Sequence, residues 1–306
     1  MLCGKRSVVF SFKFGTACRS FLVNLAITGR RLIMKTLPVG LQLYTVRSEM
    51  EKDVAATLKA VKAAGYDYVE PAGLFGLTGE QFRALLDETG LKAICAHVAL
   101  AEMLADTDKC LDTYKTIGCE YIAVPYLAEG QRPGDEGFDE VLKSIDKIGA
   151  ACAAKGLVLV YHNHDFEFKK MPDGRYGLDY MYETISPEHL QTELDTCWVN
   201  VGGEDPAAYI RKYAGRCPVV HLKDFVGSKS EHMYELIGIK SDDKEPVKNT
   251  FEFRPVGHGK QNFPAILEAA VESGAKYVIV EQDNTYDIPC LEAAKMSRDY
   301  LKSLNW

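Results

Sequence analysis

Residues 157–167 read LVLVYHNHDFE, an apolar run that ends in several side chains able to bind a metal ion. Three other apolar runs end in the same way: 190–195 (LQTELD), 218–221 (PVVH) and 277–281 (YVIVE). Four strand ends converge on one point only when the strands are parallel and closed into a barrel, whose functional site lies at the C-terminal mouth. Carboxylate oxygens together with imidazole nitrogens suit a divalent ion. The pattern therefore predicts a metalloenzyme built on a barrel.

From Pro38 onward, short β-rich runs alternate with helical patterns, most of which end at a glycine. Eight such units predict an α/β fold, a single (β/α)8 TIM barrel over residues 37–306. A doubly wound sheet is the competing architecture, but no G-x-G-x-x-G follows the first strand. The expected strands are 39–44, 68–70, 92–97, 121–125, 157–162, 190–195, 219–222 and 277–281. The expected helices are 53–64, 78–89, 106–117, 138–155, 178–185, 206–213, 263–273 and 290–304.

The charge of the chain is unevenly distributed. The 306 residues include 36 Lys and Arg against 43 Asp and Glu, a net charge of −7. Residues 1–36 hold seven of the basic residues and no acidic one, so residues 37–306 carry 29 against 43, a net of −14. Nucleic-acid binding needs clustered Lys and Arg that replace counterions. We therefore expect a small-molecule partner and no nucleic acid, with a homo-oligomer left open as an alternative.

The first 36 residues differ in composition from the rest. They are basic, apolar and contain Ser and Thr, but no apolar run reaches the roughly 18 residues of a membrane span, so no membrane partner is expected. We interpret them as a basic N-terminal extension, either disordered or the product of a mis-assigned start upstream of Met34. An organellar targeting peptide is the alternative.

The nine cysteines are an odd number, are widely spread and form no CxxC pair. Most lie in or beside apolar runs, where a free Cys behaves as a small hydrophobic residue. The pattern predicts free thiols and a reducing, cytoplasmic location.

A long insertion, residues 224–261, separates the seventh expected strand from its helix on the catalytic side of the barrel. Loops of this length in a compact domain are usually functional, often as lids. His258 lies in it between Gly257 and Gly259, where the backbone can approach a ligand closely. We expect His258 to reach the substrate; an exposed His in an ordinary glycine turn is the alternative.

Six motifs carry a resemblance to a known family. They are VGLQLYTVR at 39–47, YHNHDFEF at 161–168, ELDTCWV at 193–199, VVHLKD at 219–224, GHG at 257–259 and VIVEQD at 278–283. The chain resembles the xylose isomerase-like TIM-barrel superfamily, the sugar phosphate isomerases and epimerases. Its members include ketose 3-epimerases, inosose dehydratases and dehydroshikimate dehydratases. The resemblance implies one metal site, which in this superfamily serves isomerisation, epimerisation and elimination alike.

The resemblance also implies a ligand set of Glu, Asp, His and Glu from the fifth to the eighth strand. Asp195, His221 and Glu281 match it strand by strand. Taken singly, Asp195 could cap a helix and His221 could be a core histidine. Glu281 closes a buried strand, where a carboxylate must be paired or bound. Together the three predict metal ligands.

The fifth strand departs from the family pattern. Many relatives carry the ligand Glu at its end, where this chain has His162, Asn163 and His164, and the nearest Glu is Glu167. We predict Glu167 as the fourth ligand, with His162 or His164 lining the site or replacing it. The expected cofactor is one divalent ion, most simply Mn, with Mg, Co or Zn as alternatives.

Four further residues are candidates for the substrate site. Glu70 and His97 end earlier strands and would contact substrate hydroxyls or make structural hydrogen bonds at the rim. Lys223 would stabilise an oxyanion or pair with a nearby Asp. Trp198 would stack on a sugar face or pack beneath the site.

This site predicts proton abstraction next to a carbonyl, through a metal-stabilised enediolate. Glu281 and Glu167 are the expected acid–base pair, with His164 as the alternative base. Return of the proton gives a sugar isomerase or epimerase, the main hypothesis. Loss of a β-hydroxyl or glycosyl oxygen instead gives a dehydratase or lyase of a keto-sugar or 3-keto-glycoside. A non-catalytic sugar-binding barrel is the remaining alternative.

Overall fold

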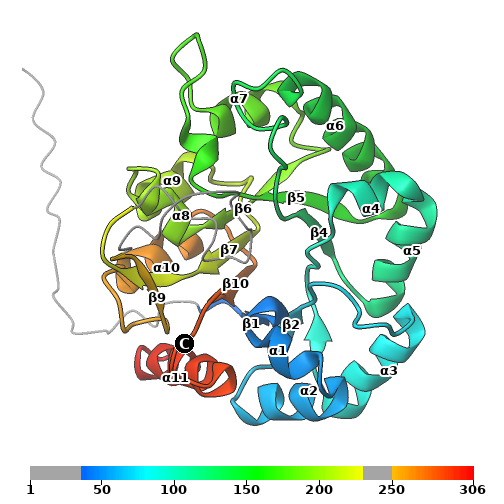
Figure 1. Ribbon diagram of the computed structural model, residues 1–306, viewed down its shortest axis with the longest axis vertical. Coiled ribbons are helices and arrows are strands. Elements are labelled where there is room, and N and C mark those ends of the chain that lie inside the picture. The colour runs from blue at the N-terminus through cyan, green and yellow to red at the C-terminus, as the bar shows by residue number, and fades with distance from the viewer. Residues whose placement is uncertain (1–35, 230–249) are drawn as a thin grey trace, which may run out of the picture. The chain divides into compact units, whose positions relative to one another are not determined.

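The computed structural model describes residues 36–229 and 250–306, and eight parallel strands ringed by helices form its centre (Figure 1). The strands pair in the order β3-β2-β1-β10-β7-β6-β5-β4, so consecutive units are neighbours and the predicted TIM barrel is confirmed. The strands are β1 Val39–Gln42, β2 Tyr68–Glu70, β3 Lys92–Ala93, β4 Tyr121–Val124, β5 Val158–His162, β6 Gln191–Asp195, β7 Val219–Leu222 and β10 Tyr277–Val280. The predicted N-terminal extension lies outside the described residues.

The barrel closes between β3 and β4 through the residues that follow β3. His97 forms parallel bridges with both Ala72 and Ala123. The amide of Ala123 donates to the carbonyl of Ala96 at 2.8 Å, and that of Val98 donates to the carbonyl of Ala123 at 3.0 Å. β3 itself is shorter than the predicted strand and ends at Ala93, and His97 is held at the mouth from both sides by isolated bridges.

Local sequence signals explain where the helices begin and end. The side chain of Thr78 caps α3 and Gln81 returns the bond, a reciprocal capping box, and Gly90 ends the helix at φ 67°. The eight main helices agree with the predicted ones to within about two residues at each end. They are α2 Val54–Ala63, α3 Gly79–Thr89, α5 Thr107–Ile117, α6 Phe138–Lys155, α7 Gly177–Thr184, α9 Pro206–Lys212, α10 Phe263–Glu272 and α11 Cys290–Ser303.

Short helices that the sequence did not predict lie in the loops after the strands, on the side of the mouth. The most consequential is α8, because its N-cap is Asp195, whose Oδ1 accepts from the amide of Trp198 at 3.0 Å. The bond leaves Oδ2 of Asp195 to face the barrel interior. These elements are η1 Leu43–Val46, α1 Arg47–Met50, α4 Leu100–Ala105, η2 Phe166–Phe168 and α8 Thr196–Val201.

The described ends of the 224–261 insertion form an antiparallel pair, β8 Asp224–Val226 with β9 Glu252–Arg254. Residues 230–249, on which the predicted cover of the mouth depends, lie outside the described residues. Asp224 organises the far end: its carboxylate accepts from the amides of Gly257 at 3.0 Å, Gly259 at 2.7 Å and Gln261 at 3.1 Å. This end of the insertion is therefore anchored by backbone donors around one buried carboxylate.

Alternation along each strand divides the buried residues into two cores. On β5, Val160 points into the barrel, whereas Tyr161 points outward to the helices. The barrel's lower interior is apolar, with the rings of Tyr68 and Tyr121 lying 5.8 Å and 6.2 Å from that of Tyr277. Its buried members are Ile94, Cys95, Tyr121, Ala123, Val160, Val219 and Ile279.

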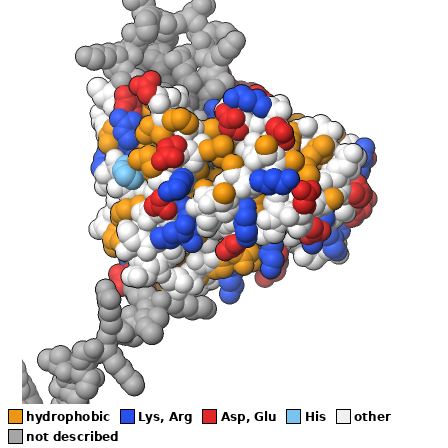
Figure 2. Space-filling model, turned by 90° about the horizontal axis from the view of Figure 1, so that it is seen from below, with side chains coloured by type: hydrophobic (Ala, Val, Ile, Leu, Met, Phe, Trp, Pro, Cys, Tyr) orange, Lys and Arg blue, Asp and Glu red, His pale blue; other side chains and the backbone are white. Residues whose placement is uncertain are grey.

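The face of the molecule drawn in Figure 2 is charged but not segregated by sign. Figure 2 shows a face on which basic and acidic side chains are interleaved with hydrophobic ones. Among the described residues, no helix combines the length and apolarity that a membrane crossing requires. The seven cysteines in this part of the chain are all free, as predicted.

Candidate active site

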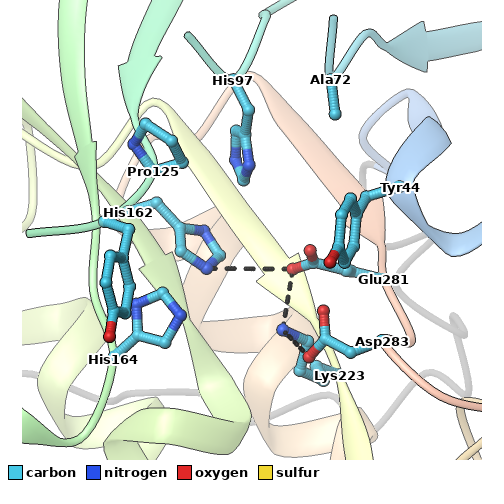
Figure 3. A pocket seen from close by; sticks show the side chains of 10 residues that line it. Tyr44, Ala72, His97, Pro125, His162, His164, Lys223, Glu281 and Asp283 are labelled. Atoms are coloured by element: carbon cyan, nitrogen blue, oxygen red, sulfur yellow. Dashed lines mark ion pairs between the residues drawn. The ribbon is translucent and has the colours of Figure 1, made fainter. Parts of the chain in front are cut away.

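A cavity of about 360 Å³ opens at the C-terminal mouth of the barrel (Figure 3). Its lining comes from the ends of seven of the eight strands, which is where a TIM barrel places its functional groups. The lining residues are Tyr44, Ala72, His97, Pro125, Tyr126, His162, His164, Lys223, Glu281 and Asp283.

Four buried side chains at the cavity floor could hold a metal ion: His162, Asp195, His221 and Glu281, whose ligand atoms lie within 4.8 Å of one another. Nε2 of His162 is 3.8 Å from both Asp195 Oδ2 and Glu281 Oε2, and Nδ1 of His221 is 2.9 Å from Glu281 Oε2. Ligands bound at about 2.1 Å are separated by roughly 3.0–3.5 Å. The observed distances of 2.9 Å and 3.8 Å fall just below and just above this range, so two nitrogens and two carboxylate oxygens could converge on one divalent ion after small side-chain shifts.

The structure does not bring Glu167, the predicted fourth ligand, into this group; His162, the alternative at the end of the same strand, lies there instead. The carboxylate of Glu167 accepts from the hydroxyl of Tyr161 at 2.5 Å and from the amide of His164 at 2.8 Å. Tyr161 belongs to the outer core, so the turn at 166–168 places Glu167 behind the strand. Burial raises the pKa of Glu167 to about 8. Glu167 also does not line the cavity, so the structure does not bring the predicted acid–base pair of Glu281 and Glu167 together there.

Beneath the four metal-competent residues lies a second buried layer centred on Glu193, which the sequence reasoning missed. Oε1 of Glu193 is 2.7 Å from His97 Nε2, 3.2 Å from His221 Nε2 and 3.3 Å from His162 Nδ1. Glu70, a predicted substrate contact, instead places Oε2 2.7 Å from His221 Nε2. Glu193 precedes Asp195 by two residues on β6, so strand alternation could have identified it.

Lys223 is 1% exposed and is surrounded by carboxylates. Its Nζ lies 3.2 Å from Asp195, 3.0 Å from Glu281 and 2.9 Å from Asp283 (Figure 3). Burial lowers the pKa of Lys223, but Asp195, Asp283 and Glu281 outweigh it and hold the pKa well above its ordinary value. The side chain is therefore a fixed cation facing the cavity. Asp283, also missed, follows Glu281 by two residues, and burial raises its pKa to about 6.

Two cavity imidazoles have opposite electrostatic surroundings. Burial, followed by the charge of Lys223, holds the pKa of His164 well below its usual range. Burial also lowers the pKa of His97, but Glu70 and Glu193 outweigh it and raise that pKa. The two rings lie on either side of His162, whose centroid is 4.8 Å from that of His97 and 5.3 Å from that of His164 (Figure 3). The surroundings thus favour the neutral form of His164 and the protonated form of His97.

The upper wall of the cavity is less polar and was not predicted. Tyr44, Ala72, Pro125 and Tyr126 form it. Each follows the end of β1, β2 or β4, so position after a strand was the available signal. These residues give a substrate a partly apolar rim above the charged floor.

Two predicted contacts lie elsewhere. Trp198 is fully buried, is not part of the cavity lining and packs beneath it, with its ring 5.2 Å from that of His164. His258 is exposed and also absent from the lining. The neighbouring glycines serve packing: a Cβ on Gly259 would lie 2.3 Å from Oδ1 of Asp224, and one on Gly257 would lie 2.2 Å from the ring of Tyr300.

Comparison with known proteins agrees with this geometry. The family model described as xylose isomerase-like TIM barrel matches residues 58–304. The chain is 24% identical over 274 residues to an inosose dehydratase of Geobacillus kaustophilus (strain HTA426), which covers 81% of this chain and 86% of that protein.

Solved structures share the fold. A sugar phosphate isomerase/epimerase from Parabacteroides distasonis ATCC 8503 superposes with a TM-score of 0.68 at 20% identity, covering 89% of this chain and 96% of that one. An IolI protein with a bound zinc atom gives a TM-score of 0.63 at 17% identity, covering 88% and 98%.

Proposed function

The chain belongs to the xylose isomerase-like TIM barrel family, and from that premise we propose that it is a divalent-metal-dependent dehydratase. Its substrate would be a keto-sugar or a related cyclic polyol ketone. The observation that carries the proposal is that two imidazoles, His97 and His164, line the cavity beside four metal-competent side chains. Similarity to an inosose dehydratase along most of the chain supports it. The earlier alternative of elimination thus takes precedence over isomerisation.

His162, Asp195, His221 and Glu281 would hold the ion. When bound, the ion would supply a Lewis acid for the substrate carbonyl. Two imidazole nitrogens among four ligands favour a borderline ion such as Zn(II) or Co(II) over Mg(II). We therefore propose Zn or Co ahead of the Mn that the resemblance suggested.

The base in this scheme is His164, which is in the cavity and is kept neutral by burial. It would remove the proton from the carbon next to the carbonyl, and the C–H electrons would pass toward the carbonyl oxygen. Lys223 would donate a hydrogen bond to the oxygen that gains negative charge, because its ammonium is fixed at the same floor.

The acid is His97, whose pKa is raised by Glu70 and Glu193. It would protonate the hydroxyl on the β-carbon as that C–O bond breaks, so that water leaves and a carbon–carbon double bond forms. One proton is taken up by His164 and one is released by His97, so exchange with solvent restores both side chains. Isomerisation or epimerisation would share only the first step, removal of the proton next to the carbonyl. In those reactions the proton would then return to carbon and no water would leave.

The test is to incubate the chain, reloaded with Zn(II), Co(II) or Mn(II), with a panel of inososes and keto-sugars in D2O. A dehydratase forms an unsaturated product and loses water, which NMR and ultraviolet absorption both detect. Deuterium uptake without loss of water would favour the isomerase or epimerase hypothesis. His164→Ala and His97→Ala should each reduce turnover by about 10²–10⁴-fold. His189→Ala, which alters only a surface pair with Asp146, is the matched control.

A further inference from the structure

We propose that Glu193, assisted by Glu70, is a positioning residue that sets the tautomers of the two imidazole ligands. Each ring would then present an unprotonated nitrogen to the metal ion. The inference rests on the proposed metal site of His162, Asp195, His221 and Glu281, and not on which reaction the site performs. It assigns a function to the buried layer beneath the ligands.

The two nitrogens of His162 face different surroundings. Nε2 faces Asp195 Oδ2 and Glu281 Oε2, both at 3.8 Å, whereas Nδ1 faces Glu193 Oε1 at 3.3 Å. No described residue gives Nδ1 a well-aligned hydrogen bond, so the nearest charge, that of Glu193, decides where the proton lies. An ionised carboxylate only accepts, which favours N–H at Nδ1 and a lone pair at Nε2.

His221 repeats the arrangement with its nitrogens exchanged. Nε2 contacts two carboxylates, Glu70 Oε2 at 2.7 Å and Glu193 Oε1 at 3.2 Å, which favours a proton on Nε2. Nδ1 is 2.9 Å from Glu281 Oε2, one of the proposed ligand atoms. The rings of His162 on β5 and His221 on β7, the strands on either side of β6, thus each turn one nitrogen to Glu193 and the other to Glu281.

The burial of Glu193 and Glu70 supports this positioning role. Glu193 and Glu70 are both 0% exposed, and a buried charge is tolerated only when it is paired. Their partners are the imidazoles of His97, His162 and His221, which gives three rings for two carboxylates. A carboxylate hydrogen-bonded to the far nitrogen of a metal-binding His fixes the orientation of the ring and raises its basicity.

The same atoms allow one competing interpretation. Ligand atoms of His97, His162, Glu193 and His221 also lie within 4.8 Å of one another, so Glu193 could itself bind a second ion. Glu193 already has protein partners at both oxygens: Oε1 lies 2.7 Å from His97 Nε2 and Oε2 accepts from Cys95 Sγ at 3.3 Å, which favours the positioning role. Metal stoichiometry separates the two interpretations.

The experiment compares the full chain with Glu193→Ala, Glu193→Gln and the control Asp146→Ala, which removes a carboxylate 2.7 Å from Nδ1 of the surface residue His189. Each is stripped with chelator and titrated with Zn(II) against a chromophoric competitor, and imidazole tautomers are read by ¹⁵N NMR. We expect one ion for the wild type. Glu193→Ala should bind it about 10–100-fold more weakly and lose the Nδ1–H signature of His162. Glu193→Gln should be intermediate, and Asp146→Ala unchanged.

An unchanged dissociation constant and an unchanged His162 tautomer in Glu193→Ala would overturn the proposal. So would two ions in the wild type and one in the variant, since Glu193 would then be a ligand. Should Glu193→Ala fail to fold, the nearly isosteric Glu193→Gln decides by the same two readouts. A wild-type chain that binds no Zn(II) would refute the proposed metal site, while the tautomers of the metal-free chain would still test the role of Glu193.

Discussion

The lower and upper halves of the barrel interior are built by the same strands, yet their side chains differ in kind. Below, Val160 and Ile279 are fully buried in a mostly apolar layer, from which the thiol of Cys95 donates to Glu193. Two residues further along the same strands stand His162 and Glu281, equally buried but charged or polar. The lower layer stabilises the fold by packing, whereas the upper layer is stable only when its charges offset one another. Residues that stabilise the fold by packing and residues of the proposed site thus lie two positions apart on the same strands.

The largest effect is expected from removal of His162, the proposed ligand in the upper layer that the sequence indicated least clearly. His162→Ala should lose stoichiometric Zn(II) and reduce turnover by about 10³-fold, because one of four ligands is removed. Glu167→Gln should retain stoichiometric metal, since that side chain faces Tyr161 behind the strand. Metal analysis after dialysis measures both. Retention by His162→Ala together with loss by Glu167→Gln would restore the original assignment.

This contrast shows what the sequence could predict. Asp195, His221 and Glu281 were identified because each ends an apolar run, and a parallel barrel brings such ends together. Glu167 lies outside the group because it is five residues beyond His162, after a turn that directs its carboxylate to the hydroxyl of Tyr161. Linear proximity to a strand end therefore predicts the site only for residues on the strand itself.

Glu193 and Asp283 were missed for a different reason. Each lies two residues from a predicted ligand, Glu193 before Asp195 and Asp283 after Glu281. Side chains two residues apart on a strand share a face, so strand alternation could have indicated both. Trp198 and His258 were assigned by residue type, a large aromatic ring and a histidine between glycines, and the structure places neither in the cavity lining. Residue type without a strand position carries little information about the site.

A second prediction tests whether a change in the apolar lower layer alters stability without altering metal affinity. Ile279→Ala should reduce the free energy of unfolding by about 2–5 kcal/mol, because it leaves a cavity among fully buried neighbours. The affinity for Zn(II) should stay within about twofold of wild type, although Glu281 is only two residues away. Urea unfolding and the competitor titration measure the two quantities. A parallel loss of metal affinity would show that the layers are not energetically separate.

A third prediction concerns the pH dependence of the metal-free chain. Burial raises the pKa of Glu70, but His97 and His221 outweigh it and lower that pKa from 4.5 to about 2. A carboxyl whose folded pKa is depressed stabilises the fold above its unfolded pKa, and this contribution is lost as the pH falls toward the folded value. The total is about 3 kcal/mol, of which about 2 should disappear between pH 5 and pH 3.

Glu70→Gln provides the matched comparison, because it keeps the shape of the side chain and cannot titrate. The stability advantage of the wild type over Glu70→Gln should therefore shrink as the pH is lowered from 5 to 3, measured by urea unfolding in the presence of chelator. Parallel pH profiles for the two chains would show that the imidazoles of the upper layer do not hold this carboxylate ionised.

The smallest expected effect lies outside both layers, at His258. Its side chain is exposed and does not line the cavity, so His258→Ala should change turnover by less than about twofold and leave the melting temperature within about 1 °C. Gly259→Ala, one residue away, should be strongly destabilising, because its Cβ would lie 2.3 Å from Asp224 Oδ1 and 2.5 Å from the carbonyl oxygen of Phe225. The loop would then depend on its glycines for packing around Asp224 and not on its imidazole for chemistry. A large loss of turnover in His258→Ala, with metal content and melting temperature unchanged, would instead return this histidine to the catalytic site.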